Sequence, residues 1–230
     1  MPESLTALTF TVYKKEAQRG FKARVDKPVA LFYYDQINEG YGRPVITRLL
    51  INHKGWLQNA ICKSSPNYNE RPEGTPVSLL VIHNISLPPG EFGGKYICDF
   101  FANCLNPVEH PYFETISDLK VSAHLLIQRD GELVQFVSFD DRAWHAGNSC
   151  YEGAENCNDF AIGIELEGAD DIPYTEDQYR ALSAVTLALM EHYPSINIGR
   201  IVGHSDIAPD RKTDPGPAFD WPHYLSSLET

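Results

Sequence analysis

The run VSLLVIHNIS at residues 77–86 constrains the fold more than any other part of this chain. Four apolar residues, Leu79 to Ile82, follow one another, and a polar turn comes soon after them. A short uninterrupted apolar run bounded by a turn is typical of a buried strand. The sequence therefore predicts a sheet against which other elements are packed.

Three further segments have strand patterns. Residues 159–168 (DFAIGIELEG) alternate apolar and polar residues, and residues 198–204 (IGRIVGH) form a last short run. Residues 121–139 contain two apolar runs separated by Asp130-Gly131, and an Asp-Gly pair is a strong hairpin signal. We expect these strands to join the run at 77–86 in one sheet.

Helical patterns lie between the strands. Residues 175–193 have apolar residues at helical spacing, with Thr175 as the expected N-cap and Pro194 just beyond the end. Residues 95–105 have the spacing of a short helix, and the Pro- and Gly-rich residues 87–94 must be a loop. The pattern predicts an α/β fold, a single domain with a central mixed β-sheet flanked by helices.

Residues 1–48 differ from the rest of the chain. The first 50 residues have a net charge of +3 and the remaining 180 a net charge of −15. The segments TALTFTVYK and PVALFYY have short strand signals, but Gly and Pro interrupt any longer pattern. We interpret residues 1–48 as an N-terminal extension and residues 49–230 as the catalytic domain.

Charge and cysteine content exclude several classes of protein. The net charge of −12 argues against nucleic acid or an anionic membrane as the main partner. No apolar run is long enough to span a membrane, and five Lys and Arg residues between positions 14 and 24 argue against a signal peptide. The five cysteines form no C-x-x-C pair, which favours reduced thiols. We expect a cytoplasmic protein.

The stretch GHSDIAPDRKTDPGPAFDW at residues 203–221 is rich in charged residues and prolines. His204 stands at the end of a predicted strand, and Asp214 follows in a segment that the prolines stiffen. His83 ends the apolar run at 79–82. Each histidine alone is more simply a hydrogen-bonded residue near the core. Together with Asp214, however, they match an open zinc site of three protein ligands and a water.

Two carboxylates share one face of the strand at 159–168. Alternation places Glu165 and Glu167 opposite the apolar residues Ile162, Ile164 and Leu166. This face is either solvated, or it points Glu165 into a cleft as a general base whose pKa burial raises. Lys212 is either a surface lysine or the group that stabilises an oxyanion, and spacing alone leaves both open.

These motifs resemble those of the zinc-dependent N-acetylmuramoyl-L-alanine amidases, in particular the cytoplasmic enzymes that cleave 1,6-anhydro-N-acetylmuramyl-L-alanine. The resemblance spans roughly residues 55–225. The stretches that carry it are LLVIHNISLPPGEFGG (79–94), VSAHLLIQRDGELVQFV (121–137), RAWHAG (142–147), NDFAIGIELEG (158–168) and residues 203–221. The long last stretch and HNISLPPGEFGG together make a chance match very improbable.

The resemblance implies a role for each matching residue. His83, His204 and Asp214 fall on the ligands of one zinc ion per chain. Glu165 falls on the catalytic glutamate and Lys212 on the catalytic lysine, which decides the question that spacing left open. The implied reaction is hydrolysis of the amide between the lactyl group of N-acetylmuramic acid and L-alanine, in peptidoglycan recycling.

The resemblance also implies how the substrate, a small muropeptide, is held by a monomeric enzyme. Trp144 and His145 are expected at the sugar end of the groove, Asn84 beside the ligand His83, and Lys120 near the stem peptide. The related enzymes often have a second basic residue where this chain has Asn156, so the peptide contacts are expected to differ. The alternatives are a secreted or phage-type cell-wall amidase and a peptidoglycan-binding module without activity, although such modules lack part of the zinc set.

Overall fold

A computed structural model describes residues 49–229, and the strand signals noted at residues 1–48 lie outside this range. Its main sheet has six strands in the order β1-β5-β4-β9-β3-β10. Neighbouring strands are parallel except for the antiparallel pair β4–β5, so the sheet is mixed, as the sequence predicts. The strands are β1 (Ile61–Cys62), β3 (Leu79–Ile85), β4 (Leu125–Ile127), β5 (Leu133–Gln135), β9 (Ala161–Glu167) and β10 (Ile201–Gly203).

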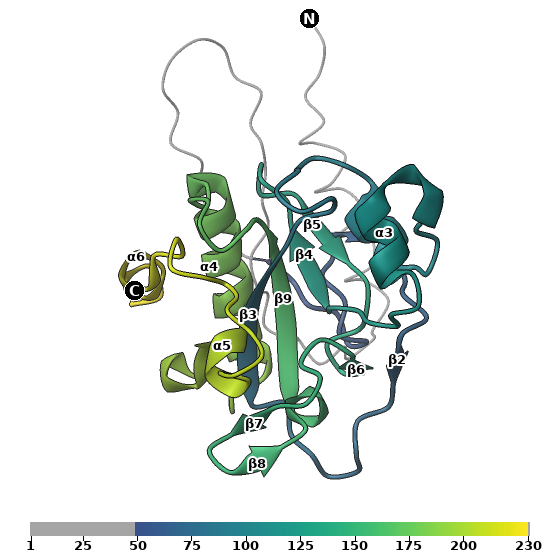
Figure 1. The fold of residues 1–230 in the computed structure, drawn as a ribbon. Helices are drawn as coiled ribbons and strands as arrows, with labels where there is room; N and C mark the ends of the chain where they lie inside the picture. Colours follow the sequence, from purple (N-terminus) through teal and green to yellow (C-terminus); the bar gives the residue numbers. More distant parts are fainter. Residues whose placement is uncertain (1–48, 230) are drawn as a thin grey trace, which may run out of the picture.

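Helices cover both faces of this sheet, which explains why β3 begins with the unbroken apolar run Leu79–Ile82. On one face, Leu80, Ile82 and Ile164 pack in a core with the long helix α4 (Glu176–His192) and the last helix α6 (Trp221–Ser226). On the other face, a second core joins β4 and β5 to α2 (Tyr96–Phe101) and α3 (Pro111–Ile116). Figure 1 shows α4 and α6 on one side of the sheet and α3 on the other.

The helix predicted at 175–193 is confirmed as α4. The Thr175 hydroxyl accepts a hydrogen bond from the Gln178 N–H, and the Gln178 side chain accepts one from the Thr175 N–H. This reciprocal capping satisfies two N–H groups that the first turn leaves unpaired, and a cap of this kind contributes about 1 kcal/mol. The hairpin predicted at Asp130-Gly131 is also confirmed, since β4 and β5 flank it.

The strand predicted at 198–204 is only partly confirmed. Residues Ile198–Arg200 form a 3-10 turn, only Ile201–Gly203 pair with β3, and His204 begins the short helix α5 (His204–Ile207). His204 therefore does not end a strand. The Asp206 carboxylate accepts a hydrogen bond from the Gly203 N–H at 2.7 Å, which caps the new helix and turns the chain away from the sheet.

Small elements complete the described part of the chain. Two short antiparallel ladders pair β2 (Tyr68–Asn69) with β6 (Arg142–Ala143) and β7 (Cys150–Tyr151) with β8 (Ala154–Glu155). Two further 3-10 turns are η2 (Pro107–Glu109) and η3 (Cys157–Asp159). No helix in residues 49–229 is long and apolar enough to cross a membrane.

Candidate metal centre and active site

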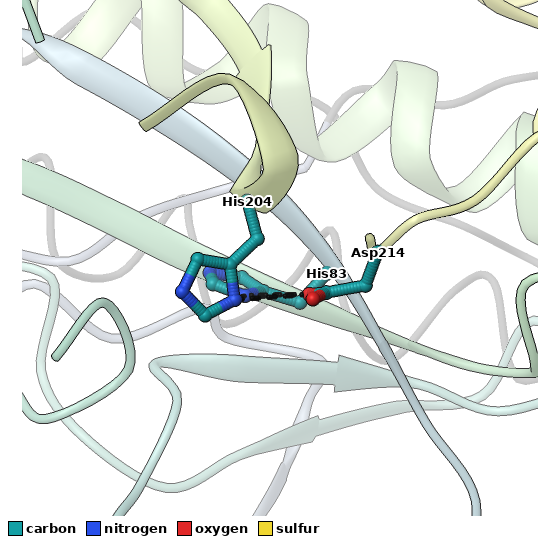
Figure 2. A group of neighbouring side chains, drawn as sticks. All are labelled: His83, His204 and Asp214. Atoms are coloured by element: carbon teal, nitrogen blue, oxygen red, sulfur yellow. Dashed lines mark hydrogen bonds and ion pairs between the residues drawn. The ribbon is translucent and has the colours of Figure 1, made fainter. Parts of the chain in front are cut away.

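Three buried side chains bring nitrogen and oxygen atoms together at one edge of the sheet. The Nδ1 atoms of His83 and His204 are 3.0 Å apart, and the Oδ2 atom of Asp214 lies 3.2 Å from the first and 3.1 Å from the second. Figure 2 shows the three side chains pointing toward one another from β3, from the start of α5 and from the loop after it. The sequence analysis named these three residues as a set.

The parallel strands determine this arrangement. Gly203, the last residue of β10, is paired with Ile82, so the next residue, His204, comes beside His83. Because parallel strands end at the same edge of a sheet, ligand sites are common there. Asp214 is held across from them by a hydrogen bond from the Ser205 N–H to the Asp214 carbonyl. The Pro215 carbonyl accepts further bonds from Asn84 and from the Tyr174 hydroxyl.

Both histidine rings direct their Nδ1 atom at the Asp214 carboxylate. The far nitrogen of His204, Nε2, lies 3.2 Å from the Ala146 carbonyl, which can only accept, so the proton of this ring is on Nε2. The Nε2 atom of His83 lies 3.0 Å from Nδ1 of His145, and where His83 donates to that nitrogen its proton is on Nε2 as well. Three atoms with lone pairs would therefore face one another, and such a set repels unless a cation lies between them.

The spacing of these atoms matches a tetrahedral metal ion. Bonds of about 2.1 Å at tetrahedral angles place neighbouring donor atoms about 3.4 Å apart. The three observed separations, 3.0, 3.1 and 3.2 Å, are a few tenths of an ångström shorter. The donor set and its geometry thus fit a metal ion that is bound by three protein ligands with a fourth position open.

The protonation states also suit metal binding. Burial lowers the pKa of His83 to about 4, so this ring is neutral at pH 7. Burial alone would raise the pKa of the Asp214 carboxyl, but its contacts with the His204 and His83 rings outweigh burial and lower the pKa below its usual range. Neutral imidazoles and an ionised carboxylate are the forms that coordinate a metal.

Glu165 lies on the strand next to His83. The two residues are paired across β9 and β3 and share a face of the sheet. Glu165 is 9% exposed, and its Oε2 atom has no hydrogen-bond partner among the described residues. Burial, with a smaller contribution from Asp214, raises the pKa of Glu165 well above its usual range. A buried carboxyl with one free oxygen is suited to accept and return a proton.

Glu167 shares the face of Glu165 but has a different environment. Its Oε1 atom accepts a hydrogen bond from the Gly93 N–H at 2.6 Å, and its Oε2 atom accepts one from the Arg129 N–H at 3.1 Å. Both carboxylate oxygens therefore accept hydrogen bonds from backbone N–H groups of loops. Of the two acids that alternation places on this face, Glu165 is the one with an oxygen free for chemistry.

A groove with a volume of about 360 Å³ contains the three metal-site residues and Glu165. Four other residues from the sequence analysis also line it: Asn84, Trp144, His145 and Lys212. Lys120 is exposed and does not line the groove, although its neighbours Leu119 and Val121 do. The structure thus brings together eight of the nine residues that the sequence analysis named.

Three of the groove residues, Asn84, Trp144 and His145, contact different groups. The Asn84 amide donates to Asp170 at 2.8 Å and to the Pro215 carbonyl at 3.1 Å, so it supports the loop that carries Asp214. The Trp144 indole N–H donates to the Asn69 side chain at 2.7 Å. His145 lies against the ligand His83 with the ring planes at 85°.

The sequence analysis missed the apolar half of the groove. Its walls come mainly from α2, α3 and the segment that follows, through Phe100, Phe101, Tyr112, Ile116 and Leu119. No motif marks these residues, because their apolar spacing is equally typical of a helix that faces the core. The groove therefore combines a polar end with the candidate metal centre and an apolar end beside it.

Fold and site together define a hydrolytic enzyme with a candidate metal centre. Residues 73–217 match the Amidase_2 family, described as N-acetylmuramoyl-L-alanine amidase. The chain belongs to this family, as its sequence motifs predicted, and is an N-acetylmuramoyl-L-alanine amidase.

Individual relatives are similar over most of their length. The chain is 58% identical over 175 residues to 1,6-anhydro-N-acetylmuramyl-L-alanine amidase AmpD of Salmonella typhimurium (strain SL1344), covering 76% of this chain and 93% of the relative. It is 57% identical over 183 residues to AmpD of Escherichia coli (strain K12), covering 79% and 100%. The crystal structure of a selenomethionine AmpD derivative superposes with a TM-score of 0.76 at 55% identity, covering 78% of this chain and 99% of that one.

Proposed function

We propose that this protein is a zinc-dependent amidase of peptidoglycan recycling. It hydrolyses the amide between the lactyl group of 1,6-anhydro-N-acetylmuramic acid and the L-alanine of the stem peptide. The observation that carries the proposal is the convergence of two histidine nitrogens and an Asp214 oxygen beside the buried carboxyl of Glu165. The similarity to 1,6-anhydro-N-acetylmuramyl-L-alanine amidases over 93% and 100% of their length supports the choice of substrate.

His83, His204 and Asp214 would hold the zinc ion. Two imidazoles and one carboxylate with an open fourth position are a donor set typical of catalytic rather than structural zinc. When bound, zinc supplies Lewis-acid polarisation of the scissile carbonyl and of a water molecule. The single negative charge of the donor set leaves the ion a net positive charge for this purpose.

Glu165 is proposed as the general base and then the general acid. Its carboxylate takes a proton from the attacking water as the new C–O bond forms at the amide carbonyl. The same group then returns the proton to the alanine nitrogen as the C–N bond breaks. The products are a free lactyl carboxyl group and a free stem peptide, and one water molecule is consumed.

Lys212 is proposed to stabilise the oxyanion of the tetrahedral intermediate. It lines the groove with Glu165 and Asp214 and is only half exposed. A cation in a partly desolvated site stabilises a developing negative charge more strongly than it does in water. The groove, with its polar and apolar ends, is proposed to hold one small muropeptide, with Trp144 and His145 toward the sugar and Lys120 near the peptide.

The direct test combines metal analysis with an amide-cleavage assay. We expect about one zinc per chain in the purified protein and cleavage of a soluble anhydro-muropeptide. Intact sacculi, assayed in parallel, should be the poorer substrate if the enzyme works on recycled fragments in the cytoplasm. Full activity in a verified metal-free sample would refute the zinc mechanism, and a preference for sacculi would refute the recycling role.

A further inference from the structure

Two neighbouring residues in the segment 144–146 contact the histidines of the candidate metal centre at their Nε2 atoms. His145 Nδ1 lies within hydrogen-bond distance of His83 Nε2, at 3.0 Å. The next residue, Ala146, accepts with its carbonyl from His204 Nε2 at 3.2 Å. The Ala146 carbonyl can only accept, so it holds the His204 proton on Nε2, and His145 Nδ1 would hold a proton on His83 Nε2 in the same way. Each Nδ1 atom then keeps its lone pair for a metal ion.

The orientation of this segment depends on a single side-chain atom. The Oδ1 atom of Asn158 accepts hydrogen bonds from the His145 N–H at 3.0 Å and from the Ala146 N–H at 2.8 Å. Two successive N–H groups that point at one oxygen fix the peptide planes on either side of the His145 Cα atom. The direction of the His145 side chain is thereby restricted, and so is the position of Ala146, whose carbonyl contacts His204.

Asn158 is itself held rigidly. It is 6% exposed and lies in the 3-10 turn η3. The Arg71 guanidinium donates to the carbonyls of Asn158 and Asp159 at 3.1 and 3.0 Å. The same guanidinium donates to the carbonyls of Phe139 and Ala161, so the backbone of Asn158 is tied to strand β9 and its surroundings.

The strand β9 leaves room for the His145 ring. A Cβ atom added at Gly163 would come within 2.4 Å of that ring. Any larger residue at position 163 would displace His145 from His83 or bend the strand. Gly163 and Asn158 thus both restrict the position of His145. Gly163 does so by leaving space for the ring, and Asn158 by a hydrogen bond to the backbone.

From these contacts we infer that Asn158 is a positioning residue for the metal centre. It orients both ligand histidines at once, through His145 and through the Ala146 carbonyl. The inference rests on the zinc site of the proposed function. The competing explanation is that Asn158 only closes a loop, as the buried Gln135 does with its hydrogen bonds to the backbone of Gly55, Leu57 and Val137.

Zinc affinity separates the two explanations. Metal-free wild type, Asn158→Ala, Asn158→Asp and the control Gln135→Ala would each compete for Zn²⁺ with a chromophoric chelator. Loss of a contact behind a metal ligand typically costs 10–100-fold in metal affinity, and we expect a loss of this size for Asn158→Ala. Asn158→Asp keeps an oxygen that can accept both N–H groups, so its affinity should stay close to that of the wild type.

Thermal unfolding of the same metal-free samples reports the structural contribution. Gln135→Ala should unfold at a lower temperature and yet bind zinc like the wild type, because Gln135 does not line the groove. Asn158→Ala with wild-type zinc affinity, or Asn158→Asp with the same loss as Asn158→Ala, would overturn the inference. If Asn158→Ala does not fold, Gly163→Ala tests the same contact, and unchanged zinc affinity in that variant would overturn the inference as well.

The wild-type measurement distinguishes this inference from the proposal on which it rests. A wild type that does not bind zinc refutes the proposed metal site, and the role of Asn158 with it. A wild type that binds zinc while Asn158→Ala binds equally well refutes the role of Asn158 alone.

Discussion

Replacing Glu165 by Gln tests the proposed chemistry most directly. The amide has nearly the shape of the carboxyl, so the packing of this buried side chain is kept, but it cannot take up a proton. General-base catalysis typically contributes 10²–10⁴-fold, which corresponds to about 3–5 kcal/mol of activation free energy. We therefore expect the single-turnover rate of amide cleavage to fall by that factor. Zinc content should stay unchanged, because Glu165 is not one of the three converging ligands.

The same substitution has a predictable effect on the stability of the metal-free protein. Burial raises the pKa of Glu165 in the folded state well above its usual range. The folded wild type then retains a proton that the unfolded chain has already released. The contribution of Glu165 to the free energy of unfolding should therefore fall as the pH rises above the ordinary glutamate pKa of about 4.3. Glu165→Gln lacks this contribution, so the stability of the wild type relative to this variant should fall over that range.

Urea unfolding of the two metal-free proteins, between about pH 5 and pH 8, measures this difference. Cleavage at a near wild-type rate by Glu165→Gln would refute the assignment of the base. Glu167 could not easily replace it, because both of its oxygens accept backbone hydrogen bonds. Identical pH dependence in the two metal-free proteins would refute the argument that burial perturbs Glu165.

Five further outcomes are expected. Chelation should abolish cleavage, and added zinc should restore it. Asp214→Ala should lose both zinc and activity. An Asp214→Ala protein with full zinc content would contradict the proposed ligand set. Lys212→Met should keep its zinc and lose about 10²–10³-fold in kcat, the cost typical of a lost oxyanion contact; a change in KM alone would assign Lys212 to binding. Thr175→Ala should lower the free energy of unfolding by about 1 kcal/mol in a denaturant titration, and no change would mean that the α4 cap is dispensable. A chain truncated to residues 48–230 keeps the buried Leu49. It should stay folded, bind zinc and cleave at a rate close to that of the full chain. An insoluble or metal-free product would show that the preceding segment belongs to the domain.

The convergence of His83, His204 and Asp214 could be predicted because the strands are parallel. His83 and His204 each follow an apolar run, and parallel runs end at one edge of a sheet. The prolines around Asp214 indicated a rigid loop near that edge. What the pattern could not show was that His204 begins a helix, since four residues are too few for a helical period to be recognised.

The different environments of Glu165 and Glu167 could not be predicted in the same way. Alternation correctly places both on one face of β9, but it does not distinguish between them. The difference depends on Gly93 and Arg129, which reach Glu167 from loops 74 and 38 residues away in the sequence. Asn158 begins the stretch NDFAIGIELEG, but its contacts could not be predicted, because an asparagine in a loop is unremarkable until its two backbone partners are known.

The position of β10 has a consequence for the motions of the C-terminal segment. This edge strand pairs with β3 through three residues only, and α5, the loop with Asp214 and α6 all follow it. A metal ion held by His83, His204 and Asp214 would cross-link this last segment to the centre of the sheet, much as a disulfide would. Local opening of residues 201–229 would then require release of the ion. Backbone amides there should therefore exchange with solvent far more slowly in the loaded protein, whereas amides in β4 and β5 should change little.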